Sequence, residues 1–137
     1  MKPQQPNVEY CIEHKDWING LWERRGLQFG DWAGADGQAH LLHRINTITR
    51  EFVTESGDYS FGELTWLPSV DDVLAMLETM APEHGLKLRN MYPIDNSPDD
   101  YEATMYTRNG LRSSRHYGTT WLIALMELLK LCDFTAS

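Results

Sequence analysis

Residues 66–80, Trp-Leu-Pro-Ser-Val-Asp-Asp-Val-Leu-Ala-Met-Leu-Glu-Thr-Met, carry the clearest structural signal in this 137-residue chain. Ser69 is a typical N-cap, and Asp72 stands where a carboxylate returns a hydrogen bond to the cap. One apolar stripe follows at helical spacing and consists of Val70, Val73, Leu74, Leu77 and Met80. Pro82 and Gly85 then end the helix. The stretch predicts a capped amphipathic helix that covers another layer of the fold.

The segments around this helix predict a mixture of helices and strands. The expected elements are a helix over Lys15–Arg25 ended by Gly26, strands over 27–32, 39–45 and 47–54 with an Asp36-Gly37 turn between the first two, strands over 86–89 and 101–108, a loop over 109–118, and a last helix, capped by Thr119 or Thr120, to about Asp133. Helices packed on an antiparallel sheet give an α+β layered sandwich.

Composition fits one globular domain, because 42% of the residues are hydrophobic and 23% are charged. Residues 1–8 are rich in Pro and Gln and are predicted to be a flexible N-terminus, which leaves 9–137 as a single α+β domain. The aromatic surplus is interpreted as core. The last helix is apolar over more than half its circumference, and a second subunit in a homodimer is one way to cover it.

The formal net charge of −8 argues against direct binding to nucleic acid or to an anionic membrane. The N-terminus lacks the apolar core of a signal peptide, and no apolar run is long enough to cross a bilayer. Cys11 and Cys132 are therefore interpreted as buried thiols of a reducing compartment, and the protein as soluble and cytoplasmic.

The acids are concentrated in one part of the chain, since eight carboxylates and no Lys or Arg lie between Glu51 and Glu83. Such a segment can present carboxylates to a basic partner in the way that nucleic-acid phosphates do. Its candidate partner-binding residues are Glu51, Glu55, Asp58, Tyr59 and Glu63, with the aromatic side chains of Trp32 and Tyr92 as further contacts. The other interpretation is an ordinary solvated acidic surface.

A basic, hydroxyl-rich segment lies just before the last helix and offers a second candidate site. Its cations are Arg108, Arg112, Arg115 and His116, accompanied by Ser113, Ser114 and Tyr117. Guanidinium groups and free N–H groups at a helix start suit a phosphate or another small anion. Alternatively, the segment is a solvated loop whose arginines pair with the protein's own acids.

Metal-binding and catalytic patterns are weak. Cys11-x-x-His14 and His40-x-x-His43 are the two metal-like spacings, but residues three apart on a strand face opposite sides. Ser113, His116 and Asp99 or Asp100 contain the residue types of a triad without a nucleophile elbow. We therefore expect no metal site, no cofactor and no enzymatic activity.

Four short motifs resemble a known group of phage proteins. They are the Gly30-Asp31-Trp32 turn, the Trp66-Leu67-Pro68 entry to the capped helix, the hairpin ending in Tyr101-Glu102-Ala103, and the closing hydrophobic helix. Over roughly residues 27–133 they are similar to the phage and prophage ABA-sandwich group. The resemblance implies a helix–sheet–helix arrangement and a phage or mobile-element origin, and it transfers no catalytic residues.

The leading functional hypothesis is a non-enzymatic phage or mobile-element protein that binds a host protein or other macromolecule in the bacterial cytoplasm. An acidic inhibitor of a defence nuclease is one example. The alternative is a protein that binds or sequesters a small anionic ligand, such as a nucleotide, through Arg108–Tyr117.

Overall fold

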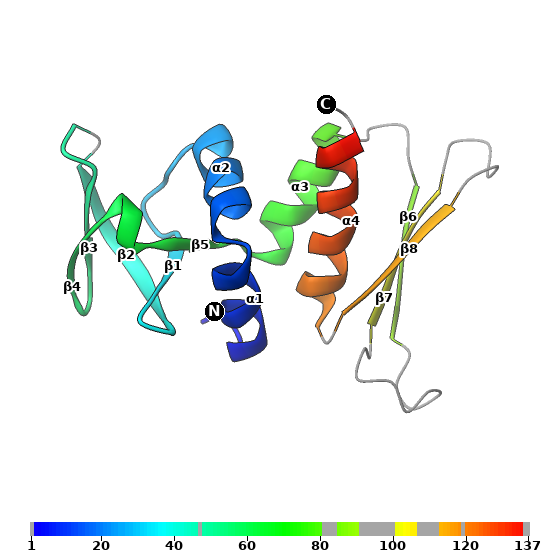
Figure 1. Ribbon diagram of the computed structural model, residues 1–137, viewed down its shortest axis with the longest axis horizontal. Helices are drawn as coiled ribbons and strands as arrows, with labels where there is room; N and C mark the ends of the chain where they lie inside the picture. Colours follow the sequence, from blue (N-terminus) through cyan, green and yellow to red (C-terminus); the bar gives the residue numbers. More distant parts are fainter. Residues whose placement is uncertain are drawn as a thin grey trace. The chain divides into compact units, whose positions relative to one another are not determined.

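The helices and strands of the chain fall into two groups (Figure 1). The computed structural model describes residues 2–46, 48–80, 85–90, 101–106, 113–118 and 120–135. The elements are α1 (Gln5–Glu13), α2 (Lys15–Arg25), β1 (Trp32–Ala35), β2 (Gln38–Asn46), β3 (Glu51–Thr54), β4 (Gly57–Ser60), the 3₁₀ turn η1 (Phe61–Glu63), β5 (Thr65–Leu67), α3 (Val70–Met80), β6 (Gly85–Asn90), β7 (Tyr101–Tyr106), β8 (Ser113–Gly118) and α4 (Trp121–Thr135).

The α+β class and the antiparallel pairing are confirmed, but the strands form two sheets. Unit 1 ends at Pro68 and holds a five-stranded sheet in the order β4-β3-β2-β1-β5. Unit 2 begins at Ser69 and holds a three-stranded sheet in the order β6-β7-β8. Pro68 follows β5 directly and has no N–H for a ladder, so strand pairing stops there. The stretch expected to belong to one domain, 9–137, thus contains two compact units.

Helical structure in unit 1 begins earlier in the chain than the sequence predicts. The helix over Lys15–Arg25 is confirmed, and Gly26 ends it with φ +99 and an N–H donated to Trp22 O at 2.9 Å. Residues 5–8, expected to be flexible, start α1 instead. Pro6 fits the first turn of a helix, where no N–H is needed, and burial of Val8 adds apolar area.

The long strand β2 joins two parts of the sheet. Its first half pairs with β1 across the expected Asp36-Gly37 turn, in which both residues have positive φ. Its second half pairs with β3, with a register shift between Leu42 and Arg44. The strand expected over 27–32 starts only at Trp32, because the residues before it form a turn around the Asp31 carboxylate.

Aromatic rings fill the core of unit 1, as the sequence predicts. The indole of Trp22 stacks on Trp66 with 6.3 Å between ring centroids and 10° between planes. Phe52 and Phe61 stack on the same indole, and the Arg25 guanidinium lies over the Trp66 ring. Rings on α2, β3, η1 and β5 therefore share one cluster.

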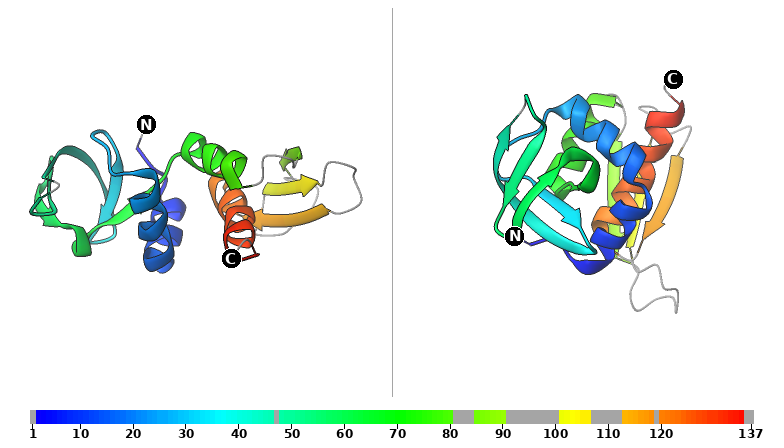
Figure 2. Two further views of the ribbon diagram at one scale, coloured as in Figure 1. Left: turned by 90° about the horizontal axis from the view of Figure 1, so that it is seen from above. Right: turned by 60° about the vertical axis from the view of Figure 1, so that its left-hand side comes forward.

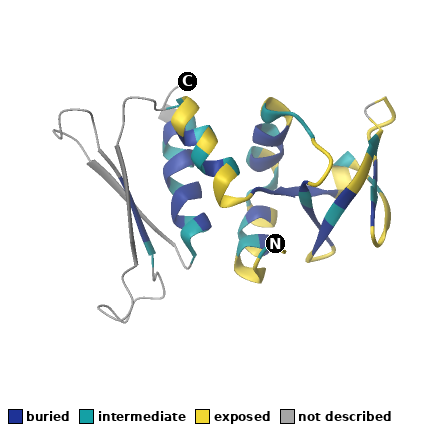
Figure 3. Cartoon of the chain, turned by 180° about the vertical axis from the view of Figure 1, so that it is seen from behind, coloured by how far each residue is buried: buried dark blue, intermediate teal, exposed yellow. Residues whose placement is uncertain are grey.

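A buried amide side chain connects α2 to the edge strand β5. Asn19 Nδ2 donates to Leu64 O at 2.8 Å, and Asn19 Oδ1 accepts from Trp66 N at 2.9 Å. Asn19 is buried, so both backbone groups depend on this one side chain. In Figure 3, β5 is correspondingly dark along its length.

Unit 2 places its two helices on one side of its sheet (Figures 1 and 2). The capping box is confirmed, because Ser69 N donates to Asp72 Oδ2 at 2.9 Å and Asp72 N donates to Ser69 Oγ at 3.1 Å. Thr120 Oγ1 accepts from Ile123 N at the start of α4. Helix α4 packs on β7, β8 and α3, so part of its broad apolar surface is covered within the unit. The homodimer stays a prediction.

Both cysteines are buried thiols outside any disulfide, as the sequence predicts. Burial raises the pKa of the Cys11 thiol to about 12 and also raises the pKa of Cys132. A thiol held neutral and out of contact with water reacts slowly.

Replacing Asn19 with Ala tests its connection to β5. The variant leaves Leu64 O and Trp66 N buried without a partner, so we expect a loss of about 2–4 kcal/mol in the free energy of unfolding measured in urea. Asn46→Ala is the matched control, since Asn46 also binds two backbone groups but is exposed, and it should cost less than about 1 kcal/mol. Equal losses would contradict the assignment.

Candidate binding surface

The strand register of β3 and β4 separates the candidate acidic residues. Glu51 pairs with Ser60, and Val53 pairs with Asp58, so these four residues share the outer face of the hairpin. Tyr59 pairs with Phe52 and lies on the inner face, where its ring contacts His40. The expected set is therefore split, and only Glu51 and Asp58 present carboxylates on one face.

Glu55 is held at the end of the hairpin. Its Oε2 accepts from Leu41 N at 2.9 Å, while its two oxygens lie 3.7 Å from His40 Nδ1 and 3.8 Å from His43 Nε2. Both histidines reach one carboxylate because the register shift in β2 turns the strand between them. The expectation that they face opposite sides is therefore wrong. His40 Nδ1 also lies 3.0 Å from Ser56 Oγ, and its Nε2 lies 3.3 Å from Ala35 O.

Glu63 serves as a cap and is exposed. Its Oε1 accepts from Ser60 N at 3.1 Å and from Ser60 Oγ at 2.9 Å. The pKa of Glu63 lies below its ordinary value, first because of the bond from the Ser60 backbone and then because of the bond from the Ser60 hydroxyl. This carboxylate is engaged locally, so it is a weak candidate for contact with a partner.

A hydrogen-bonded turn beside Glu51 exposes a large apolar side chain. Asn46 Oδ1 accepts from Ile48 N at 3.1 Å and from Thr49 N at 3.2 Å, and Arg50 N donates to Asn46 O at 2.8 Å. Arg50 takes φ +57, pairs with Glu23 of α2 at 2.5 Å and lies over the Phe61 ring. Ile48, at the tip of this turn, is 92% exposed.

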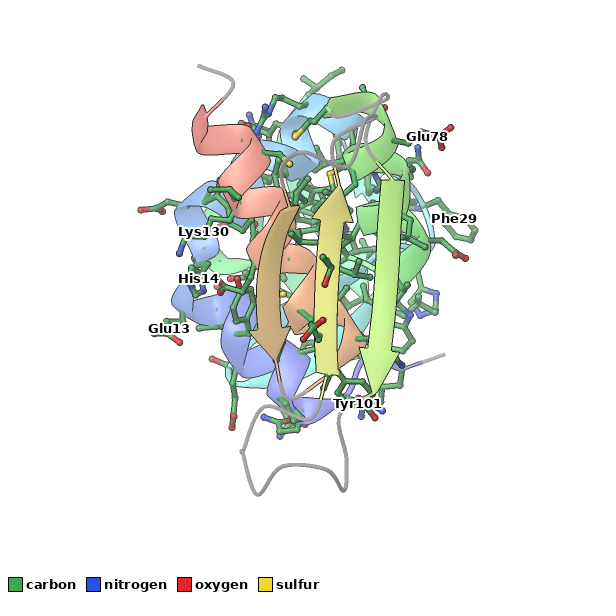
Figure 4. The ribbon with its side chains drawn as sticks, turned by 90° about the vertical axis from the view of Figure 1, so that its right-hand side faces the viewer. Glu13, His14, Phe29, Glu78, Tyr101 and Lys130 are labelled. Carbon is green, nitrogen blue, oxygen red and sulfur yellow. The ribbon has the colours of Figure 1, made fainter. Side chains whose placement is uncertain are left out.

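A second turn exposes Phe29, which is 78% accessible (labelled in Figure 4). The Asp31 carboxylate organises this turn. It accepts from Gln28 N and from Trp22 Nε1, each at 2.9 Å, and it pairs with Arg25. Neither Phe29 nor Ile48 is among the contacts expected from the sequence. The signal was present in each case as a lone large hydrophobe between turn-forming residues.

We use the name hairpin face for the outer face that carries Glu51, Val53 and Asp58, together with the preceding turn that carries Ile48. Within the described part of the chain, neither Glu51 nor Asp58 takes part in an ion pair or a side-chain hydrogen bond. Arg44 lies across from Val53 on the same face. The face therefore combines two carboxylates with available hydrogen-bonding capacity, one cation and an exposed apolar tip (exposed parts are yellow in Figure 3).

Part of the second candidate site lies on a strand and not in the expected loop. Arg115 and His116 belong to the strand β8, so the expected loop over 109–118 is wrong from Ser113 onward. In the strand register, Ser113 pairs with Tyr106, Arg115 with Thr104 and His116 with Ala103. The other residues of the triad pattern, Asp99 and Asp100, and the candidates Arg108, Arg112 and Tyr92 lie outside the described residues.

Metal ligands do not gather in the parts of the chain that are described: no group of three or more His, Cys, Asp or Glu side chains there could hold an ion. His14 stacks on Tyr10 and places Nδ1 2.9 Å from Tyr10 O. Trp32 is half-buried in β1 rather than fully exposed.

The low pKa of Glu63 predicts a small pH dependence of stability. Because the pKa is lower in the folded state, the carboxylate stabilises the fold above its unfolded pKa, and this contribution is lost as the pH falls below the unfolded pKa and through the lower folded value. Glu63→Gln should therefore lose less stability than the wild type over that range in urea titrations. A variant with the wild-type pH profile would exclude the cap as its source.

Comparisons with protein-family models, with curated proteins and with solved structures found no significant match to this chain. Among its described helices, none is long and apolar enough to cross a membrane. The resemblance to the phage ABA-sandwich group rests on its four short motifs alone.

Proposed function

We propose that unit 1 is a non-enzymatic protein-binding module whose hairpin face docks on a basic surface of another protein. The observation that carries this proposal is the pair Glu51 and Asp58, exposed on one face without a salt-bridge partner among the described residues. Carboxylates of this kind keep their full charge available for a partner and accelerate association.

Ile48 supplies the apolar part of the interface. A large side chain that is 92% exposed costs free energy in water, and the Asn46 bonds hold its turn in place. A turn that is already hydrogen-bonded in the unbound protein loses less conformational entropy on binding than an unconstrained loop, and this favours affinity. A polar rim around a desolvated anchor is the usual anatomy of a protein interface.

The partner class follows from charge. A surface that attracts paired carboxylates is basic, and basic surfaces of this kind occur on proteins that bind nucleic acid. The resemblance to phage proteins favours a host protein in the bacterial cytoplasm as the partner, such as a defence nuclease. Direct binding of unit 1 to nucleic acid does not fit the acidic face.

The proposal is tested by charge reversal with a matched control. Glu51→Lys/Asp58→Lys reverses the hairpin face, and Glu9→Lys/Glu13→Lys makes the same charge change on exposed positions of α1. Wild-type protein and both variants are immobilised and exposed to a bacterial lysate. Proteins retained by each are identified by mass spectrometry and their affinities are then measured with purified components.

We expect at least one basic protein to bind the wild type and the α1 variant equally, to bind the hairpin variant at least about 10-fold more weakly, and to be displaced by duplex DNA. Ile48→Ser should weaken the same complex without lowering the unfolding midpoint. A partner retained equally by all three proteins, or no retained partner at all, would contradict the proposal.

A further inference from the structure

The turn between β3 and β4 carries a hydroxyl group that lies against a buried histidine (the turn joins these strands in Figure 1). Ser56 is exposed on this turn. Its Oγ lies 3.0 Å from Nδ1 of His40, a residue of β2 that is only 8% exposed. The hydroxyl is therefore open to solvent, while the imidazole behind it is held within the fold.

The second ring nitrogen of His40 determines the tautomer of the neutral side chain. Nε2 lies 3.3 Å from Ala35 O. A carbonyl oxygen only accepts hydrogen bonds, so Nε2 is the nitrogen that carries the proton. Nδ1 then has a lone pair and accepts the hydrogen bond of the Ser56 hydroxyl. In this arrangement the imidazole is a general base in contact with the hydroxyl proton.

The surrounding contacts hold this pair in place. Thr54 Oγ1 accepts from Ser56 N at 3.1 Å and donates to Gly57 O at 3.0 Å, which fixes the backbone of the turn. The Tyr59 ring packs against the His40 ring with 5.6 Å between centroids. Hydroxyl and base are thus oriented before any ligand arrives, and such orientation lowers the barrier to attack by the hydroxyl.

A carboxylate lies beside the same ring nitrogen. Glu55 Oε1 is 3.7 Å from His40 Nδ1, and Glu55 Oε2 accepts from Leu41 N at 2.9 Å. When Nδ1 takes the hydroxyl proton, the imidazolium forms next to this negative charge, which lowers the free energy of that state. The turn therefore combines a hydroxyl nucleophile, a base and a carboxylate that stabilises the protonated base.

We propose that Ser56 is a site of covalent acylation, which takes the acyl group of an activated carboxylic ester. Ser56 Oγ forms a bond to the carbonyl carbon, and the bond from that carbon to the leaving alkoxide breaks. The hydroxyl proton passes to His40 Nδ1 and then to the alkoxide, so the products are an acyl-serine and an alcohol. The exposed Glu55 carboxylate disfavours an anionic donor, so the donor is uncharged or cationic. The proposal covers this one transfer and no turnover.

The test is incubation of the full chain with 4-nitrophenyl acetate, followed by mass spectrometry of its peptides. Ser56 should be acetylated at least about 10-fold faster than Ser60 and Ser69. Those two serines are exposed as well, but their hydroxyls donate to carboxylates, at 2.9 Å to Glu63 and at 3.0 Å to Asp72. They are therefore matched controls within the same molecule.

A pair of histidine variants tests the base. His40→Gln should slow acetylation of Ser56 at least about 10-fold. His43→Gln is the matched control, because His43 is half-exposed and lies 3.8 Å from the same Glu55 carboxylate, and it should change the rate less than about twofold. The anionic donor mono-4-nitrophenyl succinate should react with the wild type more slowly than the acetate does.

Because His40 is buried, far-UV circular dichroism and the unfolding midpoint in urea check that His40→Gln is folded. If it is not, the comparison among the three serines of the wild type decides the proposal alone. Equal acetylation of these serines, an unchanged rate in a folded His40→Gln protein, or a faster reaction with the succinate donor would overturn the proposal. None of these results depends on a partner of the hairpin face.

Discussion

The side chain of Asn19 is the constraint on which unit 1 depends most. It connects the middle of α2 to two backbone groups of the edge-strand segment, at Leu64 and Trp66. Apolar packing is not directional, so by itself it would let α2 shift along β5. The two hydrogen bonds of the buried Asn19 amide are directional, and they fix the position of the helix along the strand. Trp22, one turn further along α2, is thereby placed to stack on Trp66.

The Asp31 carboxylate makes a second set of connections at the C-terminal end of α2. It accepts from Trp22 Nε1 and Gln28 N and pairs with Arg25, so the helix end, the following turn and the start of β1 meet at one carboxylate. Phe29 is exposed on a turn whose backbone, at Gln28 N, is hydrogen-bonded to the buried Asp31 carboxylate. Exposure on a rigid support differs from fraying, and it is the condition under which an apolar side chain contributes to recognition.

The register of β3 and β4 places the carboxylates of Glu51 and Asp58 on one face of the hairpin. The net charge of the chain does not describe this face, because net charge says nothing about where the acids lie in the fold. The strand registers, which bring distant residues together, determine where each charge lies.

Features that local chemistry specifies were predictable from the sequence, whereas features that long-range contacts decide were not. Both the Ser69–Asp72 capping box and the Asp36-Gly37 turn depend on neighbours within three residues. Glu55, by contrast, has no recognisable partner in the sequence, because its contact with His43 depends on the bulge in β2. Strand β8 was likewise not recognised, because the polar residues of its segment are typical of a loop.

The hairpin face was only partly predictable for the same reason. Glu51 and Asp58 share a face because of the register that pairs them with Ser60 and Val53. This register is set by the turn at Glu55 and by burial of Phe52.

Native-state hydrogen exchange at the Trp66 amide tests the central claim most directly, because this N–H lies on the edge strand β5 and donates to Asn19 Oδ1. If Asn19 fixes α2 to β5, the Trp66 amide exchanges only through global unfolding of unit 1, as slowly as the protected amides of β1 and β2. Exchange at the rate of a fraying edge strand would contradict the role of Asn19.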